Sequence, residues 1–242
     1  MTGVYQIAGH RIGIESMYPD VHRFCSAYRT SGEPEITIRV PAEELEASRE
    51  AVEEKIRSGA ILPFDCSMQY LEVAWIYKKL SERMPYWDIF MLHGSAVAVD
   101  GECYAFCAKS GTGKSTHSRL WREMLGDRAV MVNDDKPMIR VREDGGADVY
   151  GTPWDGKHKL STNTHVPLKA ICFLERSSEN SIREISKSEA YPSLLQSVYR
   201  PFDPEAMEKT LQLIERMNVK FYRLWCNMDI SAAELSYQTM KG

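Results

Sequence analysis

The chain lacks the long apolar runs and the basic runs that would place it in several large classes of protein. No apolar run approaches the roughly 20 residues that a membrane-spanning helix requires. The first residues show no basic region followed by an apolar one, so we expect no secretory signal peptide. The formal net charge is −4, and no segment is rich in Lys and Arg. These features give no reason to expect nucleic acid or a membrane as a partner.

Cysteine is present, but not in any arrangement typical of a disulfide framework or a metal site. The six cysteines include no C-x-x-C pair. Cys107 and Cys172 lie in apolar, strand-like runs and are interpreted as small core residues. Unpaired thiols are typical of a reducing compartment, so we expect a cytoplasmic protein. At 242 residues and 43% hydrophobic content, the chain is long and apolar enough to bury a sizeable core.

The most informative stretch is residues 108–116, which read Ala-Lys-Ser-Gly-Thr-Gly-Lys-Ser-Thr. An apolar run precedes it and a helical pattern follows it, which is the layout of a P-loop, the turn that holds nucleotide phosphates. Gly111 and Gly113 lack a Cβ, so the backbone can adopt positive φ and turn its N–H groups inward. We expect Lys114 to reach the β/γ-phosphates and Ser115 to place its hydroxyl on Mg²⁺. The positive end of the helix dipole adds to this site.

One position departs from the usual G-x-x-x-x-G-K-[ST] pattern, because Ala108 stands where that pattern opens with glycine. The rest of the motif is intact. We therefore predict that it binds ATP, or another nucleoside polyphosphate, together with Mg²⁺. The alternative is a glycine-rich turn with an incidental Lys-Ser pair. The predicted nucleotide-binding residues are Ser110, Gly111, Thr112, Gly113, Lys114, Ser115 and Thr116.

A pair of carboxylates, Asp134 and Asp135, ends the apolar run that follows the first helix after this loop. In phosphate-loop enzymes an acidic residue at this place reaches the metal. Adjacent side chains at a strand end point to opposite sides, so one carboxylate can hold Mg²⁺ while the other faces a phosphoryl acceptor. The alternative is a solvated turn, which Asp also favours. His93, expected inside the strand that pairs with the one entering the loop, can orient a nearby carboxylate or can be a core histidine.

A second loop, residues 151–159, combines glycine, proline, an aromatic residue, an acid and lysines. Such a composition suits a loop that folds over phosphate or substrate. Lys157 and Lys159 could neutralise phosphate charge, and Asp155 could support the metal. The alternative is a surface turn.

Hydrophobic periodicity and turn signals predict an α/β fold whose sheet is mixed and contains hairpins. We expect a small α+β region over residues 1–85 and a nucleotide-binding core over residues 86–242. Residues 4–14 are either a strand pair or one irregular strand. Strands are predicted over 35–40, 89–99, 102–107, 129–132, 138–141, 148–150, 168–174 and 220–226, and helices over 41–57, 69–83, 116–125, 188–198, 204–217 and 231–240.

The motif at 110–116, the carboxylate pair and His93-Gly94 upstream resemble the HPr kinase/phosphorylase family, over roughly residues 88–176. The same core is similar to that of ATP-dependent phosphoenolpyruvate carboxykinase. The resemblance implies that Lys114 and Ser115 bind phosphate and Mg²⁺, that Asp134 is the catalytic base, that Asp135 supports the metal and that His93 bonds the acidic pair. It does not extend to residues 1–85. HPr kinases form hexamers, so a homo-oligomer is left open.

These observations predict a kinase that transfers a phosphoryl group from ATP to a hydroxyl of a small molecule, a peptide or a small protein. Short relatives of the resembled family act on free serine or on peptide hydroxyls. A regulatory module that binds ATP without transfer, a carboxykinase-like enzyme and a nucleotide-free scaffold are the alternatives. The donor is also open, since ADP or pyrophosphate would bind the same loop.

Overall fold

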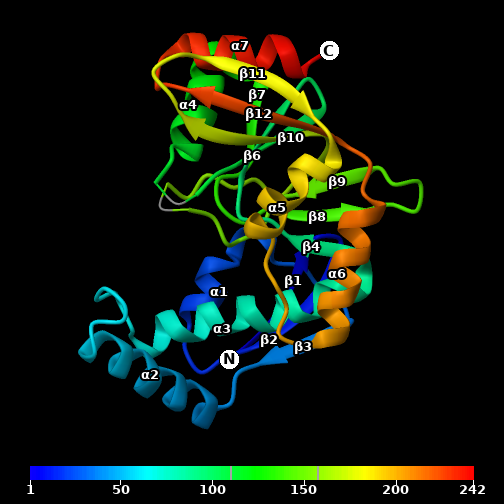
Figure 1. Cartoon of the computed structure of the whole chain (residues 1–242). Helices are drawn as coiled ribbons and strands as arrows, with labels where there is room; N and C mark the ends of the chain where they lie inside the picture. Colours follow the sequence, from blue (N-terminus) through cyan, green and yellow to red (C-terminus); the bar gives the residue numbers. More distant parts are fainter. Residues whose placement is uncertain (110, 157) are drawn as a thin grey trace. The chain divides into compact units, whose positions relative to one another are not determined.

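The structure is a computed structural model that describes residues 1–109, 111–156 and 158–242. The chain forms two compact units, Met1–Arg83 and Met84–Gly242 (Figure 1). That they are separate functional domains stays a prediction. Among the described residues, no helix combines the length and the apolar character needed to cross a bilayer.

The first unit is a small three-stranded sheet with helices. Strands β1 (Thr2–Ile7) and β2 (His10–Glu15) form an antiparallel hairpin, and β3 (Ile36–Arg39) adds parallel to β2. The hairpin turn places Ala8 and Gly9 at φ 48° and 87°, so residues 4–14 belong to a strand pair. The helical elements are α1 (Asp20–Phe24), η1 (Ser26–Tyr28), α2 (Ala42–Arg57) and α3 (Met68–Arg83).

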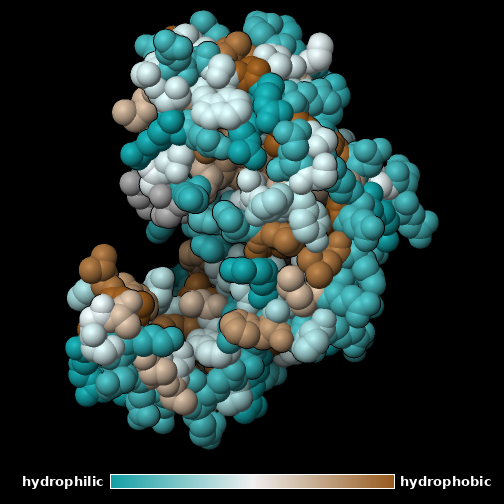
Figure 2. Space-filling view, viewed as in Figure 1, coloured by the Kyte–Doolittle hydropathy of each residue, from teal (hydrophilic) through white to brown (hydrophobic). Residues whose placement is uncertain are grey.

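Glu72 ties helix α3 to the chain that follows β2. Its carboxylate is buried and accepts hydrogen bonds from the backbone N–H groups of Met17 and Tyr18 at 2.7 and 3.0 Å. Exposed apolar side chains gather at the connection between α2 and α3, where Leu62 and Phe64 are 86% and 44% exposed (Figure 2).

The second unit is built on a mixed sheet whose order is β4-β8-β9-β10-β6-β5-β7, with β12 pairing both β10 and β11. Strand β10 runs parallel to β6 and β12, and the other pairs are antiparallel. The predicted mixed α/β sheet with hairpins is therefore confirmed. The strands are β4 (Ile89–Met91), β5 (Ser95–Val99), β6 (Glu102–Cys107), β7 (Ala129–Asn133), β8 (Met138–Val141), β9 (Ala147–Tyr150), β10 (His165–Arg176), β11 (Ser181–Ile185) and β12 (Lys220–Cys226).

Helices cover this sheet and bury two apolar clusters against it. Helices α4 and α7 lie together (Figure 1), joined by a hydrogen bond of 2.8 Å from Trp121 Nε1 to Ser236 Oγ. Asp203 begins α6 as its N-cap, since its carboxylate accepts from the N–H of Ala206 at 3.0 Å. The helical elements are η2 (Met84–Trp87), α4 (Lys114–Leu125), η3 (Gly126–Arg128), α5 (Lys187–Ser197), α6 (Pro204–Arg216) and α7 (Ile230–Met240).

The single strand predicted over 89–99 is wrong, because the chain leaves the sheet between β4 and β5. There the N–H groups of Leu92, His93 and Gly94 donate to Pro137, Ser197 and Asp135, at 3.0, 2.6 and 3.0 Å. None of these partners belongs to β6, the strand that pairs with β5, so residues 92–94 form a connection between β4 and β5. His93 consequently lies in this connection and not inside a strand, as the sequence had suggested. Strand β11 and helix α1 were not predicted from the sequence.

Candidate functional site

The loop at 108–116 joins the end of β6 to the first turn of α4. Gly111 and Gly113 have φ of 76° and 122°, and a Cβ at either would meet nothing within 4 Å. The backbone conformation, and not lack of space, is therefore what requires glycine at both positions. Arg176, at the end of β10, donates to the carbonyl oxygens of Gly111 and Thr112 and so orients two peptide groups of the loop. Ser110, predicted to bind nucleotide, lies outside the described residues.

Lys114 begins α4 and is only 9% exposed. Its Nζ donates to the carbonyl oxygen of Ala108 at 3.1 Å, which folds the side chain back over the loop. Burial lowers the pKa of this lysine, and the nearby Cys107 and Asp135 oppose that shift. The ammonium group is thus held close to the loop and partly removed from water, where an anion would bind it strongly.

Asp134 follows directly after β7 and is 4% exposed. Its Oδ1 accepts the N–H of Gly156 at 2.6 Å, whereas Oδ2 is buried without a hydrogen-bond partner among the described residues. Burying a charged oxygen without a partner is costly. Such an oxygen calls for a cation or a hydroxyl group, which a ligand in the adjoining cavity would provide.

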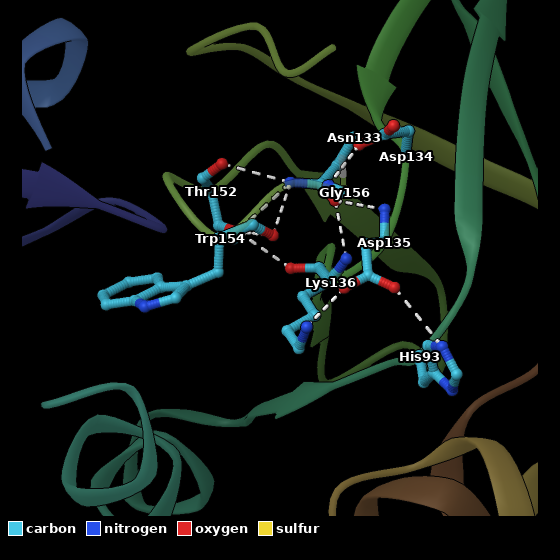
Figure 3. A network of polar contacts seen from close by, with 8 residues as sticks. All are labelled: His93, Asn133, Asp134, Asp135, Lys136, Thr152, Trp154 and Gly156. Carbon is cyan, nitrogen blue, oxygen red and sulfur yellow. Dashed lines mark hydrogen bonds and ion pairs between the residues drawn. The ribbon is translucent and has the colours of Figure 1, made fainter. Parts of the chain in front are cut away.

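Asp135 points in a different direction from Asp134 (Figure 3). Its Oδ1 lies 3.3 Å from His93 Nε2, and its Oδ2 forms an ion pair with Lys136. Burial raises the pKa of Asp135, but the hydrogen bonds from His93 and Lys136 outweigh it and bring the pKa to about 2. This carboxylate therefore stays charged at neutral pH. The predicted link between His93 and the acidic pair is present in the structure, to Asp135.

Asn133 holds the turn that carries both carboxylates, a role that was not predicted from the sequence. The side chain is fully buried. Its Oδ1 accepts the N–H groups of Asp135 and Lys136 at 2.9 and 2.6 Å, and its Nδ2 donates to both oxygens of Thr152, at 3.1 Å each. Asn133 thus joins the turn after β7 to the 151–159 loop (Figure 3). The sequence signal for this role is an asparagine at a strand end, because its side chain can accept the backbone N–H groups two and three residues further on.

A cavity of about 570 Å³ brings the loop and the two carboxylates together. Its lining includes Lys114 and Ser115 from the start of α4, and Asp134, Asp135 and His93. Its remaining described lining comprises Gly111, Gly113, Thr116, Ser118, Arg119, Arg122, Met131, Gly156, His158 and Leu160. Thr112 lines a neighbouring cavity instead. Arg122 of α4 and His158 are not singled out by the sequence pattern.

The 151–159 loop reaches the cavity through Gly156 and His158. The backbone of Gly156 approaches Asp134 so closely that a Cβ there would lie 2.9 Å from Oδ2. Asp155 accepts a hydrogen bond from Ser161 at 3.1 Å and, like the exposed Lys159, lies outside the lining of the cavity. Burial raises the pKa of Asp155. The charge of Asp134 raises it further, and the hydrogen bond from Ser161 lowers it. Lys157 lies outside the described residues.

The donor set near the loop is compatible with Mg²⁺ held jointly by protein and nucleotide. Within the described part of the chain, no three His, Cys, Asp or Glu side chains are grouped so that they could bind a metal by themselves. Mg²⁺ in phosphate sites takes one or two protein oxygens and completes its shell with phosphate oxygens and water. Ser115, Asp134 and Asp135 line one cavity, so a hydroxyl and a carboxylate are available there as protein ligands.

No protein-family model matches the chain, and neither does any curated protein. Among solved structures, the chain is similar to the Hpr(Ser) kinase/phosphatase from Coxiella burnetii, with a TM-score of 0.36 and 10% sequence identity. The similarity covers 63% of this chain and 99% of that one.

Proposed function

We propose that the chain is a kinase that transfers the γ-phosphoryl group of Mg-ATP to a hydroxyl of a small molecule, a peptide or a small protein. One observation carries the proposal: the buried carboxylate of Asp134, whose Oδ2 has no hydrogen-bond partner among the described residues, lines the same cavity as the glycine loop and Lys114. A polyphosphate on the loop and a hydroxyl on Asp134 would then share one enclosed space, as phosphoryl transfer requires.

In this proposal the loop amides and Lys114 bind the β- and γ-phosphates. Lys114 exchanges its contact with the Ala108 carbonyl for a phosphate oxygen, a better partner for an ammonium group. Ser115 and Asp135 would hold Mg²⁺, which when bound neutralises charge that develops on the phosphate oxygens.

Asp134 Oδ2 takes the proton of the acceptor hydroxyl. The acceptor oxygen then forms a bond to the γ-phosphorus, and the bond between that phosphorus and the β–γ bridging oxygen breaks. ADP leaves with the electron pair of the broken bond on its terminal oxygen. Gly156 fixes Asp134 through its N–H bond to Oδ1, which keeps Oδ2 available for this step. His93 is a positioning residue that holds Asp135. The 151–159 loop is proposed to lie beside the substrate through Gly156 and His158, which line the cavity.

Labelled phosphate transfer from ATP to a panel of amino acids, hydroxylated metabolites and seryl or threonyl peptides tests the proposal. We expect transfer to at least one acceptor by the wild type and none by Lys114→Ala. The exposed lysine variant Lys220→Ala should match the wild type, since it lies on a different part of the sheet. Binding of Mg-ATP in a thermal-shift assay without transfer to any acceptor would favour a regulatory module instead.

A further inference from the structure

A second cavity, of about 340 Å³, borders the glycine loop and has neither Asp134 nor Asp135 in its lining. Gly113 and Thr116 line both cavities, so the two meet at the start of α4. A ligand whose phosphates lie on the loop can therefore extend past Thr116 into this second space. Its volume is within the range of small-molecule sites.

The walls of this second cavity differ in chemistry from those of the first. Leu120, Leu174 and Met228 supply apolar surface, and none of its described lining residues carries a carboxylate. His117 is also part of the lining, and burial lowers its pKa to about 4, so the ring is uncharged at neutral pH. Arg176 is the one cationic side chain among the described lining residues, and it donates to the loop carbonyls of Gly111 and Thr112. Apolar walls with a few neutral polar groups suit a flat heterocycle.

Met228 gives the cavity an exposed apolar edge. Its side chain is 77% exposed, although the backbone around it is well held. Asn227 donates its N–H to Asn180 Oδ1 at 2.9 Å and accepts the N–H of Asp229 on its Oδ1 at 3.0 Å. A thioether on a fixed backbone at the rim of a cavity is well placed to pack on an aromatic face.

We propose that this cavity is the base subsite of the nucleotide, and that the phosphoryl donor is a nucleoside polyphosphate and not inorganic pyrophosphate. The inference rests on the proposed function, because it needs the phosphates to lie on the loop at 108–116. The base packs between Leu174 and Met228, and the ribose passes Thr116. Arg176 secures this arrangement by holding the loop carbonyls at the cavity rim.

Calorimetric titration of the full chain with Mg-ATP and with Mg-tripolyphosphate tests this inference. We expect the wild type to bind ATP at least about tenfold more tightly than tripolyphosphate, since only ATP fills the second cavity. Met228→Ser should weaken ATP binding by about tenfold and leave tripolyphosphate binding unchanged, while Met228→Leu should retain most of the ATP affinity. Ile230→Ser is the matched control, because Ile230 is also an exposed apolar residue but does not line the cavity.

Equal affinities of the wild type for ATP and tripolyphosphate would overturn the base subsite and leave the phosphate site standing. Equal weakening of both ligands by Met228→Ser would do the same. Absence of binding by either ligand would instead overturn the proposed function, and this inference with it.

Discussion

Replacing Asn133 by alanine should destabilise the turn that carries both candidate carboxylates. The fully buried Asn133 side chain accepts two backbone N–H groups, from Asp135 and Lys136, and donates to Thr152 in the neighbouring loop. Alanine leaves these partly buried backbone N–H groups, and the buried Thr152 oxygens, without their partners.

The cost follows from the number of hydrogen bonds and from the burial of their donors. Each net hydrogen bond contributes about 1 kcal/mol, and a buried group left unsatisfied costs about 1–3 kcal/mol. With two backbone donors and one side-chain link removed, we expect Asn133→Ala to lower the free energy of unfolding of the second unit by about 3 kcal/mol. Activity should fall further than stability alone explains, because Asp134 and Asp135 lose their fixed positions.

Urea unfolding followed by tryptophan fluorescence measures this change. In a Trp75→Phe background the remaining tryptophans, Trp87, Trp121, Trp154 and Trp225, all belong to the second unit. Asn218→Ala is the matched control, because Asn218 is exposed and its backbone N–H bond to Gly145 is retained. If Asn133→Ala unfolds within about 0.5 kcal/mol of Asn218→Ala, then Asn133 does not hold the turn.

Two further predictions concern the same region. Gly156→Ala should lower transfer activity at least about tenfold and should change stability in urea less than Asn133→Ala does. The new Cβ would lie 2.9 Å from Asp134 Oδ2 and displace the carboxylate. Unchanged activity would contradict this close approach. Burial lowers the pKa of His117 to about 4, so the free energy of unfolding should decrease as the pH falls from 7 to 5. The unfolded chain binds a proton at this histidine near pH 6.5, whereas the folded chain binds it only near pH 4. The loss should be about 2 kcal/mol by urea unfolding and should be absent in His117→Gln; an equal loss in that variant would rule out His117 as its source.

The fold was largely predictable where turn chemistry and periodicity agreed. The hairpin at Asp100-Gly101, with φ of 52° and 85°, and the helix capped by Asp203 follow from local residue preferences. The break between β4 and β5 did not, because residues 89–99 are apolar almost throughout. Their backbone donors are diverted to Pro137, Ser197 and Asp135, partners that only the tertiary structure supplies.

The candidate site shows the same division between local and distant information. The glycine loop and the carboxylate pair are contiguous motifs, and the sequence identified them as candidates. The bond from the Gly156 N–H to Asp134 joins residues 22 positions apart, and the Asn133–Thr152 bonds span 19. Such contacts leave no spacing pattern. The composition of the 151–159 loop therefore pointed to Asp155 and Lys159. The contacts from this loop to Asp134 and Asn133 are made instead by the Gly156 N–H and by Thr152.

The most direct test of the account is to separate nucleotide binding from phosphoryl transfer in Asp134→Asn. Calorimetry with Mg-ATP and a transfer assay with the best acceptor give the two values for the same preparation, with the exposed Asp127→Asn as control. We expect Asp134→Asn to bind Mg-ATP about as well as the wild type and to lose at least about 100-fold in turnover, because the amide cannot accept the acceptor's proton. Turnover equal to that of the wild type would contradict the role given to Asp134.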